Sequence, residues 1–281
     1  MQLNTELKTG GILCLIIVTM SLVSFFWIPH DYNQMDHTKR FLPPLSRSET
    51  NSPGESVYHL LGTDNFGRDI FSRIMTGGRN SLFLAVFTVA AAAALGSLLG
   101  LLAGYLGGLT EIIIMRIIDT ISSFPGIVFA LLMVAVMDNS QFTLFFALLI
   151  IFTPSFTRVM RTGAKQYRDA AFIQAERILG AGFFRITFIH ILPNIFPSLL
   201  SASVLGLSNA ILAEAAMSYL GMGIQPPEPS WGRMLYEAQT YFTAAPWSAL
   251  APGIFIVLTV VTFHLLGEGI YQNFGGRRGT S

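Results

Sequence analysis

The amino-acid sequence predicts an all-α, polytopic membrane protein with six transmembrane helices. Of its 281 residues, 52% are apolar and only 12% are charged, which is about half the charged fraction of an ordinary soluble domain. The mean hydropathy is +0.57. Six intervals of the chain are also apolar over the length of about 20 residues that a helix needs to cross the hydrocarbon. Lipid is therefore the expected solvent of most of the chain.

The expected spans follow one another along the whole chain. The first follows Lys8 and ends at Pro29 without a small-residue cleavage site, so we expect an uncleaved anchor rather than a signal peptide. The expected spans cover about residues 10–28, 81–105, 112–136, 142–160, 196–222 and 249–271. An even number of spans places both termini on the same side of the membrane.

Glycines recur on one face of the second expected span. Gly96, Gly100 and Gly104 occupy every fourth position, and Ala92 lies one step earlier. Such a face lets the backbone of another helix approach closely. Both a tight contact within a transport bundle and the general packing of any membrane protein are compatible with this pattern.

The third expected span is interrupted by charge and by proline. Arg116 and Asp119 lie three residues apart near one end, and we expect a local ion pair whose side chains reach toward the membrane surface. Pro125 lies further in. It removes a backbone donor and clashes with the preceding turn, so a kink is expected there.

Loop charges predict which side each end faces. The segment after the fourth span is rich in basic residues, and the tail adds Arg277 and Arg278, which marks the cytoplasmic side. The basic residues of that segment are Arg158, Arg161, Lys165, Arg168, Arg177 and Arg185. Residues 30–79 balance their basic residues with as many acidic ones, so we expect them outside. Both termini are then cytoplasmic.

The outer segment is expected to be an irregular loop that gives way to a helix-like stretch near Arg68 to Met75. Its loop character rests on proline, serine and glycine at Pro43, Pro44, Ser46, Ser48, Ser52, Pro53 and Gly54. A second, shorter outer segment is expected between about Gly223 and Trp247.

Several function classes lack support in the sequence. The net charge of +1 provides no basic excess for a nucleic acid. The single cysteine, Cys14, cannot form an internal disulfide or a multi-thiolate metal site. No lysine lies in a phosphate-binding loop, and no nucleophile elbow is present. We therefore expect no catalytic residue, no metal site and no cofactor in this chain.

Residues 166–195, between the fourth and fifth spans, carry a pattern that a plain linker would lack. Tyr167, Ala171, Gln174, Ala175 and Ile178 recur at helical spacing, which predicts a short amphipathic helix. Gly180 permits a sharp exit from that helix. A second helix is expected over residues 183–191, ended by Pro193. This segment is either a loop lying on the lipid headgroups or a rigid lever that fits a groove on a partner.

The lever interpretation is favoured by a resemblance. Gln174, Ala175 and Glu176, followed by Gly180 and then Leu192 and Pro193, resemble the EAA loop of ABC importer permeases. That loop is written Glu-Ala-Ala-x3-Gly-x9-Ile-x-Leu-Pro. Gln174 stands for the first Glu, Glu176 for the second Ala and His190 for the Ile, whereas the spacing from the glycine to Leu-Pro is kept.

Two longer blocks are similar to the dipeptide, oligopeptide and nickel branch of these permeases. The first is Leu61-Gly62-Thr63-Asp64-Asn65-Phe66-Gly67-Arg68-Asp69 with its continuation to Leu82. The second is residues 214–223 with the following Gln225-Pro226-Pro227 and Pro229-Ser230-Trp231-Gly232. With Leu266-Gly267-Glu268-Gly269, the resemblance covers nearly the whole chain.

The resemblance implies a type I (MetI-like) ABC importer permease fold in a bacterial cytoplasmic (inner) membrane. It divides the chain into the N-terminal end with the first span (1–28), an extracytoplasmic segment (29–77), a permease domain (78–272) with a coupling loop (166–195), and a cytoplasmic tail (273–281). The implied ATPase-coupling residues are Arg168, Asp169, Gln174, Ala175, Glu176, Gly180, Leu192 and Pro193.

The same resemblance implies partners. They are a homologous second permease subunit, two ATPase subunits that bind ATP and Mg²⁺, an extracytoplasmic solute-binding protein, and membrane lipid, with no nucleic acid. The substrate stays open between peptides and nickel, cobalt or metallophore complexes. His37 and His59 in the outer segment do not establish metal transport.

Two alternatives remain at this stage. An ATP-independent secondary carrier or channel is the rival function, although ionisable residues along a pathway are scarce. Glu214, in the fifth span, is either a hydrogen-bonded brace between the span and the outer loop, which we favour, or a proton or cation site.

Overall fold

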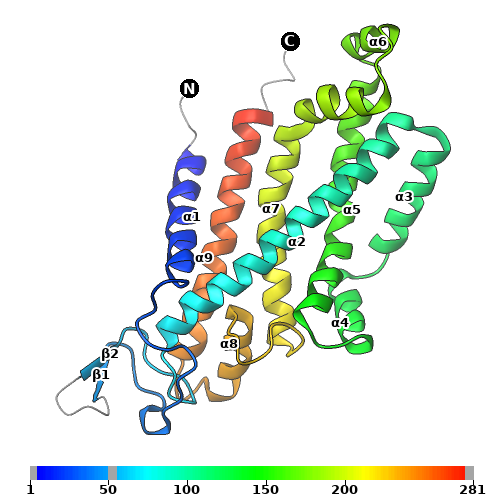
Figure 1. The fold of residues 1–281 in the computed structure, drawn as a ribbon. Helices are drawn as coiled ribbons and strands as arrows, with labels where there is room; N and C mark the ends of the chain where they lie inside the picture. Colours follow the sequence, from blue (N-terminus) through cyan, green and yellow to red (C-terminus); the bar gives the residue numbers. More distant parts are fainter. Residues whose placement is uncertain (1–4, 50–55, 276–281) are drawn as a thin grey trace.

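The computed structural model describes residues 5–49 and 56–275, and most of them are helical (Figure 1). The elements in chain order are α1 (Thr5–Val23), the 3₁₀ turn η1 (His37–Lys39), β1 (Ser46–Glu49), β2 (Ser56–His59), α2 (Ile70–Leu106), α3 (Gly108–Ser122), α4 (Gly126–Val136), α5 (Gln141–Arg168), α6 (Ala171–Ile178), the π-helical turn η2 (Arg185–Ile191), α7 (Leu192–Tyr219), α8 (Trp231–Ala238), the 3₁₀ turn η3 (Gln239–Tyr241), α9 (Trp247–Ile270) and the π-helical turn η4 (Tyr271–Gly275).

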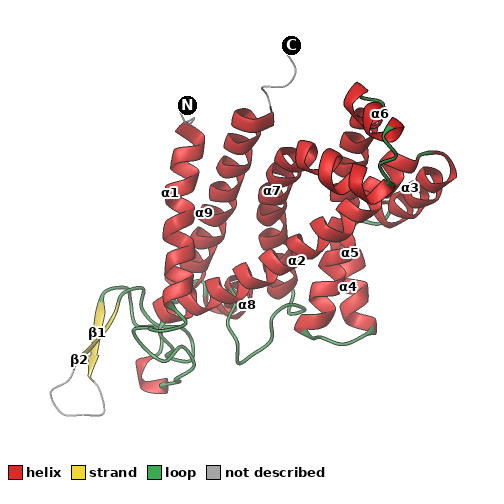
Figure 2. Cartoon of the chain, turned by 45° about the horizontal axis from the view of Figure 1, so that its top comes forward, coloured by secondary structure: helices red, strands yellow, loops and turns green. Residues whose placement is uncertain are grey.

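The long helices run back and forth between two ends of one bundle. One end holds the start of α1, the end of α9 and α6, and we name it the terminal end; the other holds β1, β2 and α8, and we name it the hairpin end (Figures 1 and 2). Within the described residues five helices are long and apolar enough to cross a membrane, and the bent pair α3 and α4 makes six if it counts as one span. Both ends of the described chain lie at one end of the bundle, as six spans require.

The first span lies earlier in the sequence than expected. α1 begins at Thr5 and ends at Val23, whereas residues 10–28 were predicted. Its start extends into polar Glu6 and Lys8, which are good helix formers. At the other end the chain leaves the helix through turns at residues 24–26, before Pro29.

The second span is much longer than the predicted 81–105. α2 has 37 residues, about 55 Å at 1.5 Å per residue, and it runs obliquely across the bundle (Figure 1). Asp69 caps its start, because the carboxylate Oδ2 accepts a 2.8 Å hydrogen bond from the Ser72 backbone N–H. The helix-like stretch expected near Arg68 to Met75 is therefore the beginning of α2 itself, inside the segment assigned to the extracytoplasmic side.

The glycine face of α2 packs against α5. A Cβ atom built on Gly96 would lie 2.6 Å from the Phe156 Cβ, and one on Gly100 would lie 2.6 Å from the Met160 Cβ. On Gly104 it would lie 2.5 Å from the Arg161 carbonyl oxygen. The predicted close helix contact is confirmed, and α5 is the partner that the sequence left unnamed.

The third span is broken rather than kinked. α3 ends at Ser122, α4 begins at Gly126, and the two helices are bent by 82°. α3 ends before Pro125, because the proline has no N–H for the hydrogen-bond ladder and disfavours helical backbone at the residue before it, and Pro125 itself has an extended ψ of 120°. Pro125 was expected to bend the span, and the change of direction exceeds a simple kink.

Pro193 does not end the helix before the fifth span, contrary to expectation. The π-helical turn η2 runs directly into α7, and the Leu192 N–H bonds to the Thr187 carbonyl, five residues back. Pro193 then occupies the first turn of α7, where its missing N–H costs little. The segment 185–219 is thus one continuous helical path.

The segment that we expected outside contains a short hairpin instead of only irregular loop. β1 and β2 pair antiparallel, with Ser46 opposite His59 and Arg47 opposite Tyr58. Ser46 and Ser48, expected in the loop, belong to β1. The expected loop residues Ser52, Pro53 and Gly54 and the tail residues Arg277 and Arg278 lie outside the described residues.

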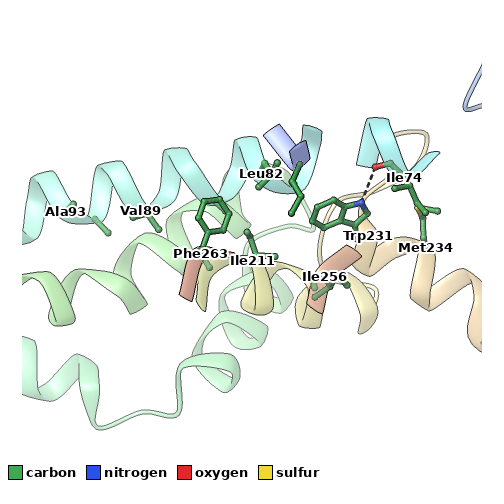
Figure 3. Packing of buried hydrophobic residues seen from close by; sticks show 14 of the residues in the cluster. Ile74, Leu82, Val89, Ala93, Ile211, Trp231, Met234, Ile256 and Phe263 are labelled. Atoms are coloured by element: carbon green, nitrogen blue, oxygen red, sulfur yellow. Dashed lines mark hydrogen bonds between the residues drawn. The ribbon is translucent and has the colours of Figure 1, made fainter. Parts of the chain in front are cut away.

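The main core lies where α2, α7, α8 and α9 meet. Trp231 of α8 is fully buried there, and its Nε1 donates a 3.0 Å hydrogen bond to the Ile74 carbonyl of α2 (Figure 3). Ile211 of α7 and Ile256 of α9 belong to the same cluster. A tryptophan with its indole N–H satisfied fills a large volume at no polar cost. α8, which the sequence analysis did not predict as a helix, is therefore locked onto the bundle.

Candidate functional site

α6 and the turn after it lie at the terminal end, beyond the ends of α5 and α7 (Figures 1 and 2). The short amphipathic helix predicted from the spacing of Tyr167 to Ile178 is observed as α6, Ala171–Ile178. α5 extends eight residues past the predicted end of the fourth span, so Arg168 is its last residue and Asp169 follows as its cap. The short helix is joined to α5 by only two residues, which leaves little freedom in its position.

One apolar side chain anchors α6. Ile173 is fully buried and packs in a cluster with Met160 of α5, with Ile186 and Ile191 of η2, and with Ile195 of α7. The cluster joins the helices on both sides of the loop. Ile173 therefore connects α6 to both α5 and α7 through packed side chains.

Gly180 makes the sharp turn that the sequence predicted. Its φ is +83°, a left-handed conformation that glycine adopts without steric cost. The Gly180 N–H bonds to the Arg177 carbonyl at 3.0 Å, and the Ala181 N–H bonds to the Glu176 carbonyl at 3.0 Å. This pair of bonds is the Schellman ending of a helix. No atom of the described chain lies within 4 Å of a Cβ built there, so backbone conformation and not space requires the glycine.

Polar side chains hold α6 to the neighbouring segments. The Glu176 carboxylate lies 3.6 Å from the His190 Nε2 and 3.9 Å from the Arg185 Nε, both on η2. The Gln174 Nε2 donates a 3.0 Å hydrogen bond back to the Asp169 carbonyl. Glu176 thus joins α6 to η2, and Gln174 joins it to the residue that caps α5.

Arg177 makes a further contact, which the sequence analysis did not identify. Its guanidinium carbon lies 5.0 Å from the centre of the Tyr105 ring, at the end of α2, and one guanidinium nitrogen donates to the Arg168 carbonyl at 3.3 Å. The amphipathic pattern alone does place Arg177 on the polar face of α6. Its partner comes from a helix more than 70 residues earlier in the chain, which spacing cannot reveal.

The tip of α6 exposes large apolar side chains. Ile178 is 87% exposed and Leu179 is 80% exposed. Phe172 at the start of α6 and Phe184 just before η2 are also exposed. We name these four residues the docking surface. Of the remaining predicted coupling residues, Ala175 is exposed on α6, Leu192 is half-buried against the Ile173 cluster, and Pro193 is exposed at the start of α7.

Glu214 lies in α7, toward the hairpin end, and is fully buried. Its Oε2 accepts a 2.8 Å hydrogen bond from the Ser81 hydroxyl of α2, and its Oε1 accepts a 2.6 Å bond from the Ser218 hydroxyl of α7. Burial of an unpartnered carboxylate is costly, and here both oxygens have partners. The arrangement has the geometry of a brace between the two spans α2 and α7, whereas the favoured prediction joined the span to the outer loop.

The predicted ion pair between Arg116 and Asp119 is wrong, because Asp119 has a different basic partner. The Asp119 Oδ1 is paired with the Arg158 Nη2 of α5 at 3.1 Å. Both Arg116 and Asp119 are exposed on α3. α5 lies alongside α3, which brings Arg158 next to the Asp119 carboxylate. The spacing of Arg116 and Asp119 along α3 could not predict this contact.

A buried charge cluster at the hairpin end also escaped the sequence analysis. Glu237 of α8 accepts bonds from Arg68 at 2.6 Å, Arg73 at 2.9 Å and Arg233 at 3.2 Å, and Asp64 pairs with Arg68 at 2.7 Å. Burial alone raises the pKa of Glu237, but the nearby charges of Arg73 and Arg68 outweigh it and hold that pKa below the ordinary value. Asp64 and Arg68 belong to the first long block of the resemblance, so that block ties α2 to α8.

Comparison with known proteins places these features in a family. The family model described as "Binding-protein-dependent transport system inner membrane component" matches residues 96–279. The chain is 35% identical over 267 residues to the dipeptide transport system permease protein DppC of Haemophilus influenzae, covering 95% of this chain and 89% of that protein. It is 36% identical over 262 residues to the glutathione transport system permease protein GsiD of Pectobacterium atrosepticum, covering 93% of this chain and 83% of that protein.

A solved structure shares the fold. A chain of the MetNI methionine ABC transporter in an inward-facing conformation superposes with a TM-score of 0.50 and 16% identity, covering 68% of this chain and 94% of that chain. The family match, the length of the alignments and this similarity of fold agree with the motifs at residues 61–82, 174–193 and 214–232. The chain belongs to the binding-protein-dependent transport system inner membrane components, and it is a multi-pass ABC importer permease of the dipeptide family with the type I importer fold.

Proposed function

We propose that this chain is the permease subunit of an ATP-driven importer of short peptides and that α6 couples it to ATPase subunits. The observation that carries the coupling role is the docking surface, which exposes two large aliphatic side chains on a helix that buries only Ile173. Exposed apolar patches of this kind favour a protein partner. The ATPase subunits supply bound ATP and Mg²⁺, and this chain itself binds neither.

The proposed coupling is mechanical. Closure of two ATPase subunits around ATP moves α6, and the cluster around Ile173 carries that movement into α5 and α7. Because packed helices shift as rigid bodies, the spans then tilt between inward-open and outward-open arrangements. A homologous second permease subunit completes the pathway, and an extracytoplasmic solute-binding protein delivers the substrate.

The terminal end faces the cytoplasm in this proposal. It carries Arg161, Lys165, Arg168, Arg177 and Arg185, and positive residues near span ends favour the cytoplasmic side. The hairpin end then faces the extracytoplasmic side of a bacterial inner membrane. Labelling of single cysteines in a Cys14→Ala background tests this orientation: Tyr58→Cys is expected to react with an impermeant maleimide from outside, and Ile178→Cys only after permeabilisation. The opposite pattern would reverse the topology.

Peptides are the proposed substrate class because relatives along nearly the whole chain are named for dipeptides and for glutathione. Nickel, cobalt or metallophore complexes are the other class that the sequence left open. Competition of labelled dipeptide uptake by unlabelled peptides, glutathione and nickel salts in cells that express the natural operon separates them. If unlabelled peptides and glutathione fail to compete with labelled dipeptide and only metal complexes inhibit its uptake, the peptide assignment is contradicted.

The experiment that tests the coupling role uses two matched substitutions. Leu179→Asp puts a charge on the docking surface, and Leu109→Asp puts the same charge on an equally exposed leucine at the start of α3 (74% exposed). We expect Leu179→Asp to lose ATPase subunits on purification and to lose uptake, while Leu109→Asp retains both. Retention of the ATPase subunits and of uptake by Leu179→Asp would remove the assignment.

The rival function, an ATP-independent carrier or channel, is tested in the same preparation. Proteoliposomes that contain only this chain and its partner permease are expected to take up no substrate, and addition of the ATPase subunits, the binding protein and ATP restores uptake that vanadate inhibits. Uptake without ATPase subunits would instead establish the carrier.

A further inference from the structure

Two histidines and an aspartate meet at the hairpin end. His30 lies in the loop after α1, His59 ends β2 and Asp69 caps α2, and one potential ligand atom from each lies within 4.8 Å of the others. His59 is 5% exposed and Asp69 is 4% exposed, while His30 is half-buried. The three residues are far apart in the sequence, which is why no metal-binding spacing was visible there.

The hydrogen bonds around the cluster orient its ligand atoms. The His30 Nε2 lies 3.2 Å from the Tyr58 carbonyl oxygen. A carbonyl only accepts, so Nε2 donates, and in the neutral ring Nδ1 keeps a free lone pair. The His59 Nε2 lies 3.0 Å from the Ser48 hydroxyl, and its Nδ1 lies 2.9 Å from the Asp69 Oδ1. Backing of ligand histidines by such outer hydrogen bonds is the common arrangement at metal centres.

The two oxygens of Asp69 have separate tasks. Oδ2 accepts from both the backbone N–H and the hydroxyl of Ser72, each at 2.8 Å. Oδ1 is left to face His59. The Ser72 hydroxyl in turn accepts a 3.0 Å hydrogen bond from the His30 backbone N–H. Asp69 therefore presents one oxygen to the histidines while the other caps α2 and indirectly holds the His30 loop in place.

From this geometry we infer that His30, His59 and Asp69 form a binding site for a divalent transition-metal ion, with Zn²⁺ as the best match. Two imidazole nitrogens and one carboxylate oxygen are a ligand set that Zn²⁺ takes in three-ligand sites. The ion replaces the proton between the His59 Nδ1 and Asp69. That proton moves to the His59 Nε2, which then donates a hydrogen bond to the Ser48 hydroxyl. The imidazole changes tautomer but stays neutral.

All three residues of the cluster line one cavity. The cavity has a volume of about 330 Å³, and Asp31 and Asp36 also line it, so it admits water and has a negative lining. Lys39 lines it too, but its ammonium is already paired with Asp36 at 3.1 Å and does not compete with a cation for the cluster.

The ion would join three segments of the outer region, namely the loop after α1, the hairpin and the start of α2. This role is independent of the proposed peptide import, since the cation is a resident of the fold and not the cargo. Binding to the folded state alone raises its stability by mass action.

The test measures Zn²⁺ on the purified full-length chain, prepared with an affinity tag that contains no histidine and stripped with a chelator. His30→Gln removes one ligand, and His37→Gln is the matched control, because His37 lies in the same outer segment outside the cluster. We expect one tightly bound equivalent of Zn²⁺ by elemental analysis in the wild type and in His37→Gln, and none in His30→Gln. Added Zn²⁺ should raise the melting temperature of the first two proteins only.

Two further measurements keep the test independent of the folding of one variant. Ser48→Ala, which removes an outer hydrogen bond, should weaken Zn²⁺ binding about 10-fold or more. Zinc K-edge absorption on the wild type should show imidazole scattering from two ligands. A wild type that binds no stoichiometric Zn²⁺, an absorption spectrum without imidazole, or a folded His30→Gln that binds Zn²⁺ as the wild type does would each overturn the site.

Discussion

The Glu214 carboxylate of α7 accepts a 2.8 Å hydrogen bond from the Ser81 hydroxyl of α2, at a position with no solvent exposure. Ser81 lies in the first long block of the resemblance and Glu214 begins the second. The contact therefore connects two sequence blocks separated by more than 130 residues. It also joins two of the helices that form the main core, α2 and α7.

Substitutions at Glu214 separate a brace from an ion site. Glu214→Gln keeps the shape and the capacity to bond to both serines, so the brace predicts nearly wild-type stability and uptake. Glu214→Ala leaves the Ser81 hydroxyl buried without this partner, which costs about 1 to 3 kcal/mol, while the Ser218 hydroxyl still accepts a hydrogen bond from the Ile224 N–H. Thermal unfolding in detergent and peptide uptake check both. A stable Glu214→Gln complex that no longer transports would instead indicate a proton or cation site.

The close contact between α2 and α5 predicts that a methyl group added at Gly100 lowers stability, whereas one added at Gly11 does not. Gly100→Ala places a Cβ 2.6 Å from both the Met160 Cβ and the Thr157 carbonyl oxygen, and overpacking of this kind destabilises by about 1 to 3 kcal/mol. Gly11→Ala in α1 is the control, because no atom of the described residues lies within 4 Å of its Cβ. We expect a lower melting temperature for Gly100→Ala and no loss for Gly11→Ala. Equal melting temperatures would show that α2 and α5 separate freely.

The turn at Gly180 predicts dependence on backbone conformation alone. Gly180→Val forces a β-branched residue into a φ of +83°, a strain of about 1 to 3 kcal/mol, and α6 must change its angle. Gly180→Asn is the matched control, since asparagine tolerates left-handed backbone. We expect Gly180→Val to insert normally but to lose ATPase retention or uptake, with Gly180→Asn close to wild type. Wild-type values in the valine variant would remove the coupling role of this turn.

The charge cluster around Glu237 predicts a pH-dependent stability. Because the folded-state pKa of Glu237 is lowered by Arg73 and Arg68, its contribution is present above the ordinary glutamate pKa and is lost as the pH falls through the folded value. At pH 7, Glu237→Gln removes one of the two carboxylates that pair with the buried Arg68 and Arg73 and leaves them only Asp64, which costs up to about 3 to 5 kcal/mol. The difference in melting temperature between this variant and wild type should therefore shrink at low pH.

An exposed ion pair supplies the comparison for that experiment. Asp119→Asn breaks the ion pair with Arg158. The Asp119 side chain is 60% exposed and the Arg158 side chain is 45% exposed, and exposed pairs contribute about 1 kcal/mol or less. We expect a small change in melting temperature at pH 7. A larger loss in Asp119→Asn than in Glu237→Gln would contradict the importance assigned to the buried cluster.

Local chemistry explains which features could be predicted from the sequence. The apolar intervals place the spans because the length needed to cross lipid is a property of each segment by itself. The roles of the glycines of α2 and of Gly180 could be predicted because they are local. A missing side chain permits close helix approach or left-handed backbone at the glycine itself. Pro125 similarly breaks the third span through its own ring and its missing donor.

The boundaries and partners depended on tertiary structure. α2 begins at Ile70 because Asp69 caps it, and it runs on without a break into the second span, whereas the sequence suggested a separate helix-like stretch near Arg68 to Met75. Pro193 lies inside a continuous helical path, because the π-helical turn before it ends with a hydrogen bond from the Leu192 N–H to the Thr187 carbonyl, five residues back. Asp119 pairs with Arg158 because α5 runs beside α3, and spacing along α3 alone suggested Arg116 instead.

By itself the sequence determined the helical class, the number of apolar passages, the close-packing face of α2 and the turn after α6, since each follows from residues adjacent in the chain or one helical turn apart. Only the tertiary structure decided what Glu214, Glu237, Arg177 and the cluster of His30, His59 and Asp69 contact. Their partners come from segments that meet after the helices pack, and the free energy of burying a charged or polar group depends on those partners rather than on its neighbours in sequence.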